Sequence, residues 1–502
     1  MTIPSSSIGL PTTGAKVTSA TYVPASTGQA DGEYCKVIGE ISPVDPHAQN
    51  IRFEVNLPTT WNHKALQIGG GGYDGRLITG LGQPPFGPMS GPTPTGRGYA
   101  TFGSDSGHEG TVADGSFATN DETLANFGGD QIKKTHDAVL AIIKARYGAT
   151  PARVYFAGNS QGGHETLLAI QRWPQDYDGA IATHPVYDFT MVQIDGNYLA
   201  RKAYANHGAG WLNPNKVKML QAAVMDACDG LDGVKDGIIS NVAACRKAFH
   251  ISTLRCPGGV DSGDSCLSDA QIEFVNTLNS PLQLDFALAH GLNSFPRWPI
   301  LEGGDWTDLF TLGHRAQPSV PPTPTVDFGL AVLSDPMIRF FVTKDPNFNS
   351  LTFDPNHYQQ RLVELSNLID ANNPDLSAFK NRGGKLLLMH GTVDTAVSPY
   401  NTINYYNRMV GEFGQSSLDD FVRFYMVPGF GHGTGQFIAS WDSLGALENW
   451  VEHGAAPGEL VVTDSTPGHN GRSMPMCVYP KWPRYNGTGD VNAASSFTCV
   501  TG

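Results

Sequence analysis

The feature that most constrains this chain is a short glycine-containing turn between an apolar segment and a helical one. Residues 158–162 read Gly-Asn-Ser-Gln-Gly and follow the apolar run 154–156, while residues 165–172 show helical spacing. A strand, a sharp turn and a helix in this order are typical of a parallel α/β sheet. The Gly-x-Ser-x-Gly pattern occurs by chance, but in this context it indicates a nucleophile elbow. We expect Ser160 to present its hydroxyl there, with the Gln161 amide facing a developing oxyanion.

Alternating strand and helix patterns run through both ends of the chain. Residues 51–55 alternate as a half-buried strand does, and residues 131–146 carry apolar side chains at helical spacing. Near the other end, apolar strands are expected at residues 385–389 and 421–427, followed by a helix at residues 441–453. These patterns predict an α/β fold.

The middle of the chain breaks this alternation. Between about Val186 and Ser377 the sequence contains Asp-Gly repeats, a proline cluster and four of the seven cysteines. At 502 residues the chain is also too long for one ordinary hydrophobic core. We interpret the middle segment as an inserted second domain.

Two further residues complete a catalytic arrangement with Ser160. A serine nucleophile needs a base, and the base needs an orienting carboxylate. Asp394 follows the expected strand 385–389, and His432 lies in a glycine-rich loop after the expected strand 421–427. Alone, each could be a turn residue or a surface histidine. Three such residues in the order Ser, Asp, His, each after an expected strand, predict a triad.

A run of four glycines is a candidate for the second oxyanion donor. Residues 69–72 follow the expected strand 66–68, and glycines let backbone amides approach a substrate closely. A simple flexible loop is the alternative, whereas a phosphate-binding loop is disfavoured because its flanking residues are missing. We expect Gly71 or Gly72 to donate together with Gln161.

An Asp-rich loop in the inserted segment could hold a metal. The carboxylates of Asp229, Asp232 and Asp236 and the carbonyls of Val234 and Ile238 would form an all-oxygen shell, which suits Ca²⁺. The spacing is not that of an EF-hand. A run of Asp-Gly turns explains the same residues equally well.

Charge and hydropathy argue against two kinds of partner. The net charge is −14, the isoelectric point is about 5.5, and the sequence has no run of Lys or Arg. The chain therefore lacks the basic surface that nucleic acids and anionic membranes attract. No apolar run reaches the roughly 18 residues that a membrane-spanning helix needs. We expect neither nucleic acid nor membrane as a partner, and the sequence does not indicate an oligomeric state.

The cysteines bear on the cellular compartment. Bonds between close neighbours would close three short loops, which favours an oxidising compartment, although the sequence alone does not fix connectivity. The N-terminus lacks a signal-peptide pattern, so the alternatives are a cytoplasmic protein or one whose signal peptide is absent from this sequence. Cys35 has no close neighbour. The other six cysteines fall into three pairs that are close in sequence: 228/245, 256/266 and 477/499.

Several stretches together resemble the tannase and feruloyl esterase family, which includes hydrolases of small terephthalate monoesters. The resemblance implies an α/β-hydrolase core of residues 1–186 and 377–502 with residues 187–376 inserted as a lid. The similar stretches are residues 104–108, 126–128, 158–162, 171–174, 176–179, 375–379, 383–385, 390–391, 428–429 and 477–480.

The same resemblance implies a structural calcium ion and three disulfides. The Asp-rich loop would hold the ion through Asp229, Asp232, Val234, Asp236 and Ile238. Members of the family are typically secreted or periplasmic, so we expect that location here. The implied disulfides are Cys228–Cys245, Cys256–Cys266 and Cys477–Cys499.

The chain departs from the family pattern at one important place. The family usually has a cysteine just before the nucleophile and another just after the catalytic histidine, and their disulfide ties the two loops together. Asn159 and Gly433 occupy these positions here. We expect hydrogen bonds of Asn159 to replace the covalent tie, and Cys35 to be a free thiol.

The function predicted is that of a carboxylic ester hydrolase acting on feruloyl, galloyl or terephthaloyl-type esters. Ala396 and Val397, just beyond Asp394, are expected to border the substrate. Acyl transfer to an alcohol and non-hydrolytic binding on the same scaffold remain alternatives. Aromatic residues of the inserted segment could line the pocket, although ordinary core packing is preferred for most of them: Trp298, Trp306, Phe310, Phe340, Phe341 and Phe348.

Overall fold

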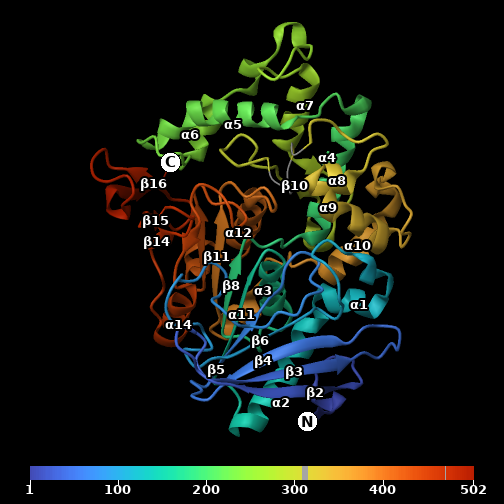
Figure 1. Cartoon of the computed structure of the whole chain (residues 1–502), viewed down its shortest axis with the longest axis vertical. Helices are drawn as coiled ribbons and strands as arrows, with labels where there is room; N and C mark the ends of the chain where they lie inside the picture. Colours follow the sequence, from blue (N-terminus) through green and yellow to red (C-terminus); the bar gives the residue numbers. More distant parts are fainter. Residues whose placement is uncertain (308–311, 313–314, 470, 502) are drawn as a thin grey trace.

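A mixed sheet forms the centre of the molecule (Figure 1). In the computed structural model, which describes residues 1–307, 312, 315–469 and 471–501, this sheet has ten strands in the order β1-β2-β3-β4-β6-β5-β7-β8-β11-β12. The strands are β1 (Thr2–Ile3), β2 (Gly14–Val23), β3 (Tyr34–Ser42), β4 (Ile51–Pro58), β5 (Lys64–Ile68), β6 (Ala100–Ser104), β7 (Arg153–Asn159), β8 (Gly179–Thr183), β11 (Lys385–Gly391) and β12 (Val422–Val427).

The six strands from β6 to β12 run parallel, whereas β1 to β4 are antiparallel to their neighbours. Helices cover the sheet on both faces. They are α1 (Asp121–Ala125), α2 (Gln131–Tyr147), α3 (Gln161–Arg172), α11 (Ser377–Asn381), α12 (Pro399–Phe413), α13 (Gln415–Asp419) and α14 (Ser443–His453). Because both faces are covered, β6 and β8 are buried along their whole length.

Alternate residues of β11 show how the two faces are filled. Leu386 and Leu388 pack in the hydrophobic cluster that includes α2, α3 and α12. Leu387 and Met389 point the other way, into the cluster that includes α14. The predicted α/β fold is therefore confirmed, and the central strands read as apolar runs because both of their faces are buried.

Several element boundaries differ from the sequence expectation by a few residues, and two of these differences lie at the site. Helix α3 begins at Gln161 rather than at residue 165, because two glycines that weaken the helical pattern lie inside its first turn. Strand β11 runs to Gly391, so His390 belongs to the strand rather than to the loop after it.

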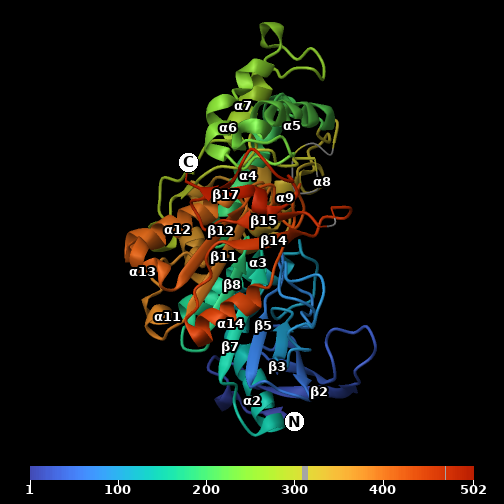
Figure 2. The same ribbon diagram turned by 90° about the vertical axis from the view of Figure 1, so that its left-hand side faces the viewer.

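The chain leaves the sheet after β8 and returns at β11; we call residues 184–384 the inserted segment. Figures 1 and 2 show most of it, including α5, α6 and α7, at the end of the molecule opposite β2, whereas its last helix, α11, lies beside the sheet. The boundaries predicted at residues 186/187 and 376/377 fall inside this span. Its elements include α4 (Phe189–Gly208), α5 (Pro214–Cys228), α6 (Val242–Ala248), α7 (Asp269–Leu278), β9 (Leu282–Gln283), β10 (Ser294–Phe295), α8 (Pro324–Asp327), α9 (Gly329–Pro336) and α10 (Gln359–Ile369).

The inserted segment builds most of a second hydrophobic core. Trp306 and Phe341 are fully buried in it, and Phe340 and Phe348 pack against it half-buried. Trp298 belongs to the same core and also lines the cavity described below. The sixth aromatic residue considered, Phe310, lies outside the described residues.

Three disulfides form between neighbouring cysteines. The bonds Cys228–Cys245 and Cys256–Cys266 lie in the inserted segment, and Cys477–Cys499 lies in the C-terminal part. Cys35 is free and half-buried. All three implied pairings are confirmed, and so is the free thiol.

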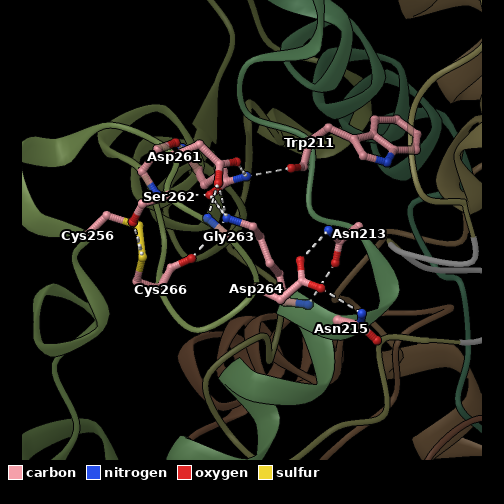
Figure 3. Close-up of polar contacts among 12 residues, drawn as sticks. Trp211, Asn213, Asn215, Cys256, Asp261, Ser262, Gly263, Asp264 and Cys266 are labelled. Carbon is pink, nitrogen blue, oxygen red and sulfur yellow. Dashed lines mark hydrogen bonds and ion pairs between the residues drawn. A yellow bond between two sulfur atoms is a disulfide. The ribbon is translucent and has the colours of Figure 1, made fainter.

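The Cys256–Cys266 bond closes a loop (Figure 3). Polar contacts join this loop to the first residues of α5 and to the residue before it. Asp264 accepts hydrogen bonds from the side chains of Asn213 and Asn215. The buried Lys216 ammonium donates to an Asp261 carboxylate oxygen, the Cys266 carbonyl and the Gln271 side chain, each at 2.9 Å. The polar groups of this loop thus satisfy one another.

The C-terminal part adds two small sheets (Figure 2). They are β13 (Ala439–Ser440) with β14 (Leu460–Asp464) and β15 (Ser473–Met476), and β16 (Trp482–Tyr485) with β17 (Phe497–Val500). The first packs on β12 through β15, and the second packs on β15. None of the described helices combines the length and the hydropathy of a membrane-spanning segment.

Candidate active site

Ser160 lies on a strained turn between β7 and α3. Its backbone has φ 60° and ψ −120°, a conformation that a residue with a Cβ rarely adopts. The turn is possible only because glycines flank it. A Cβ on Gly158 would lie 2.1 Å from the Gly162 carbonyl oxygen, and one on Gly162 would lie 2.8 Å from the Gly70 carbonyl oxygen. The local geometry is that of a nucleophile elbow.

The structure pairs Asp394 with His432. The Asp394 Oδ2 atom is 2.7 Å from Nδ1 of His432, and Oδ1 accepts the amides of Ala396 and Val397 at 2.8 and 2.9 Å. Burial alone would raise the pKa of Asp394, but the facing imidazoles of His432 and His390 lower it well below its usual range. Asp394 is therefore a buried carboxylate that orients the His432 ring.

His390 is a second histidine on the same carboxylate, and the sequence interpretation missed it. Its Nε2 atom is 3.2 Å from Asp394 Oδ2 and 3.0 Å from the Val397 carbonyl oxygen. The Thr402 hydroxyl lies 2.8 Å from Nδ1. Nε2 faces only acceptors, so it carries the proton. The sequence signal for this residue was a histidine at the end of β11, four residues before Asp394.

The glycine run supplies amides beside Ser160. Gly69 and Gly70 use their amides within the protein, bonding to the Ala157 carbonyl and to Glu165. Among the described residues, the amides of Gly71 and Gly72 have no acceptor. The Gln161 amide is at the first position of α3 and has no acceptor within the helix. The predicted oxyanion donors are thus the amides left unused.

Two buried carboxyl groups lie behind this glycine run, and the sequence interpretation did not include them. Glu165 Oε2 accepts the Gly70 amide at 2.9 Å, and Oε1 accepts the Gln131 side chain at 2.7 Å. A Cβ on Gly70 would lie 1.9 Å from Asp74 Oδ2, so both carboxyls contact the same residue. Burial raises the pKa of Glu165 to about 7, and burial together with the Glu165 charge raises that of Asp74.

A cavity of about 520 Å³ opens in front of Ser160. Ser160, His432, Gly71, Gly72 and Gln161 all line it, and so do Ala396 and Val397, the residues predicted to border the substrate. Its other walls are largely apolar and come from the inserted segment, with Val186, Phe189, Val192, Trp298, Leu330 and Leu333 among them. Of the described residues that line the cavity, none is Lys, Arg, Asp or Glu.

The Asp-rich loop lies next to the loop that carries His432. Ile238 is buried, and its side chain lies 3.1 Å from where a Cβ on Gly429 would be. Asp236 makes an ion pair with Arg472 at 3.1 Å, and Asp232 is buried.

A different group of described residues brings three possible ligand atoms within 4.8 Å of one another: His136, Asp137 and Asp176. The Lys133 ammonium lies 2.8 Å from a carboxylate oxygen of both Asp137 and Asp176, so it already supplies the positive charge there. The three carboxylates of the Asp-rich loop are spread more widely, and each accepts backbone amides of the loop.

Comparison with known proteins identifies the family. The model of the family described as tannase and feruloyl esterase matches residues 35–500. The chain belongs to this family. An uncharacterised esterase of Agrobacterium fabrum is 42% identical over 508 residues, covering 99% of this chain and 91% of the relative. Feruloyl esterase B of Aspergillus niger is 28% identical, covering 94% and 88%.

Another relative is the mono(2-hydroxyethyl) terephthalate hydrolase of Piscinibacter sakaiensis, 29% identical over 93% of this chain and 85% of the relative. Among solved structures, feruloyl esterase B of Aspergillus oryzae superimposes with a TM-score of 0.79 at 23% identity, covering 99% and 98% of the two chains. The resemblance inferred from the sequence is confirmed. This tannase and feruloyl esterase family member is a carboxylic ester hydrolase.

The buried Glu165 gives a testable pH dependence. Its carboxyl keeps a proton in the folded protein up to about pH 7, whereas the unfolded chain releases it near the ordinary value of 4.5. The folded state therefore binds more protons in this range, and the free energy of unfolding falls as pH rises through it.

We expect Glu165→Gln to make that fall less steep between about pH 5 and pH 8, measured by denaturant unfolding. Glu412→Gln, on the exposed side of α12, is the matched control and should leave the slope unchanged. Equal slopes in Glu165→Gln and the wild type would contradict this assignment.

Proposed function

We propose that this protein hydrolyses esters whose aromatic acyl group carries no charge, through a triad of Ser160, His432 and Asp394. The observation that carries the proposal is one cavity that contains a serine on a strained elbow and a histidine oriented by a buried carboxylate. Serine hydrolases require these groups and this order of contacts.

In the proposed mechanism His432 acts as base and then as acid. Asp394 holds Nδ1, which leaves Nε2, on the other edge of the ring, to take the Ser160 proton. The serine oxygen attacks the ester carbonyl, and the alcohol leaves with that proton to give an acyl-enzyme. Water, deprotonated by His432, then releases the acid. The amides of Gln161 and of Gly71 or Gly72 stabilise the oxyanion in both steps.

The character of the cavity supports an aromatic acyl group. Phe189, Trp298 and Leu330 give the cavity apolar walls, two of them aromatic. Burying an aromatic ring against such walls is favourable. Relatives are named feruloyl esterase and mono(2-hydroxyethyl) terephthalate hydrolase. The inserted segment supplies most of these walls, so we propose that it acts as a lid over the substrate.

The same cavity disfavours a substrate with a free carboxylate. Since no described lining residue is Lys or Arg, a carboxylate on the acyl group would be buried without a cationic partner. Such burial costs several kcal/mol unless the charge is paired. Feruloyl-type and other uncharged aromatic esters are therefore the preferred class over terephthalate monoesters.

A matched pair of substrates tests this preference. Dimethyl terephthalate is uncharged, and monomethyl terephthalate differs from it by one free carboxylate. We expect kcat/KM to be at least about 10-fold higher for the diester, with methyl ferulate and methyl gallate also hydrolysed, because an unpaired buried charge costs more than about 1.4 kcal/mol. Ser160→Ala, as control, should abolish all of these activities. A faster reaction with the monoester would contradict the proposed specificity.

We also propose that the Asp-rich loop holds a structural Ca²⁺ ion. Support comes from the donor chemistry, since Asp229, Asp232 and Asp236 offer hard carboxylate oxygens and Val234 and Ile238 offer carbonyls. Among the described residues, the carboxylates have one ion-pair partner, Arg472, so three negative charges face one positive charge. An ion here would stiffen the loop whose Ile238 packs against Gly429, in the loop that carries His432.

Chelation tests the calcium proposal. We expect EGTA to lower the melting temperature by about 5 °C or more, because an ion bound only to the folded state stabilises it, and added Ca²⁺ to restore it. The double variant Asp229→Asn with Asp232→Asn should melt at the lower temperature with or without EGTA. Asp264→Asn, in the separate loop of Figure 3, is the control and should still respond to EGTA. A wild-type melting temperature unchanged by EGTA would contradict the proposal.

The disulfides support a proposed secreted or periplasmic location. Cys228, Cys245, Cys256 and Cys477 are nearly inaccessible to solvent in their bonds. Disulfides of this kind persist in oxidising compartments.

A further inference from the structure

A fourth side chain connects the two loops that carry Ser160 and His432. His184 follows β8 directly and is completely buried. Its backbone has φ +43°, in the left-handed region that disfavours a residue with a Cβ. The His184 amide donates to the Met389 carbonyl of β11 at 2.8 Å, which helps to hold this conformation. The ring is therefore fixed at a point where β7, β8 and β11 all end.

One edge of the His184 ring contacts the nucleophile turn. Its Nδ1 atom lies 2.9 Å from Oδ1 of Asn159, the residue before Ser160. The same oxygen accepts the Thr183 hydroxyl at 3.0 Å. Since Oδ1 is an acceptor, Nδ1 of His184 carries the proton and donates. The two donors fix the Asn159 side chain on the end of β8.

The same ring also packs against the acid–base side of the site. The His184 ring centre is 4.8 Å from that of His390 and 5.5 Å from that of His432, and both pairs are T-shaped, with interplanar angles of 67° and 69°. Phe430, two residues before His432, packs edge-on at 4.8 Å. His184 thus touches the strand that leads to Asp394 as well as the loop of His432.

No covalent bond makes this connection. The three disulfides of the described residues lie in the inserted segment and the C-terminal part, and none joins the loops of Ser160 and His432. We propose that His184 is a positioning residue that couples the Ser160 turn to His432, through its hydrogen bond to Asn159 and its ring contacts.

The charge of His184 suits this role. Burial, reinforced by neighbouring His390, lowers its pKa well below the usual range, so the ring is neutral near neutral pH. A neutral ring can pack against His432 without opposing the positive charge that His432 gains during the reaction. Besides His390, the titratable groups that face His184 are His432 and Asp394.

The inference rests on the proposed function and predicts a specific kinetic effect. His184 does not line the cavity among the described residues, so its loss should leave substrate binding nearly unchanged. Misplacing the serine relative to its base by a fraction of an ångström slows the chemical step strongly. The effect should therefore fall on kcat and not on KM.

The main variant is His184→Phe, which keeps an aromatic ring of similar size and removes the donor to Asn159. With dimethyl terephthalate we expect kcat to fall about 10- to 100-fold, with KM within about 3-fold of wild type and the melting temperature nearly unchanged. Asn159→Ala removes the acceptor instead, and it covers the case in which His184→Phe fails to fold. His357→Phe, at an exposed histidine of the inserted segment, is the matched control and should behave as wild type.

A double-mutant cycle then isolates the coupling. If the His184–Asn159 bond acts as a unit, kcat of the double variant should be no lower than that of the more affected single variant. Wild-type kcat in both single variants, or losses that multiply in the double variant, would overturn the proposal. Ser160→Ala distinguishes failure of the proposed triad from failure of the positioning role, because activity that survives this substitution refutes the triad itself. If Ser160→Ala is inactive but the His184 and Asn159 variants are not impaired, only the positioning role fails.

Discussion

The site depends on one buried carboxylate. Asp394 receives hydrogen bonds on both oxygens, from two backbone amides on one and from the rings of His432 and His390 on the other. A carboxylate without solvent is stable only when its charge is compensated in this way. Because its partners come from β11, its following loop and the loop after β12, the same contacts fix the relative positions of these segments.

Close contact between backbone segments fixes the nucleophile turn against the glycine run. Gly158 and Gly162 let the nucleophile turn contact the glycine run, where Gly70 is held by the carboxyl of Glu165. From the next turn of this loop, the buried Tyr73 hydroxyl donates to the Leu333 carbonyl of α9 at 2.6 Å. The amides proposed to stabilise the oxyanion and helix α9, which lines the cavity, are thus connected through a few residues of one loop.

The local sequence pattern was enough to predict the strained turn at Ser160 and the loops that carry the three residues of the proposed triad. Ser160, Asp394 and His432 each follow an apolar strand, and the order of strands along the chain tells where such loops meet. The disulfide pairs followed from short spacings and the family resemblance. His184 and Glu165 could not be found this way, since what marks them is packing between segments far apart in the sequence. A histidine after a strand and a glutamate in a helix are ordinary in a sequence.

The shape of the cavity was likewise beyond the sequence. Its walls combine the loop after β5, the start of α4 and helix α9, which lie in separate parts of the chain. Only their arrangement shows that Trp298 reaches the cavity while Trp306 is enclosed in the core. Specificity therefore has to be argued from the assembled surface, whereas the reaction class could be argued from three loops.

The most direct test of Ser160 as nucleophile is to react the protein with a fluorophosphonate and to locate the adduct by peptide mass spectrometry. A phosphonate captures the serine that the base activates, so it reports on nucleophilicity without requiring the natural ester. We expect stoichiometric modification at Ser160, and its loss in His432→Ala although the serine is still present. No adduct, or an adduct on another residue, would contradict the assignment of Ser160 as nucleophile.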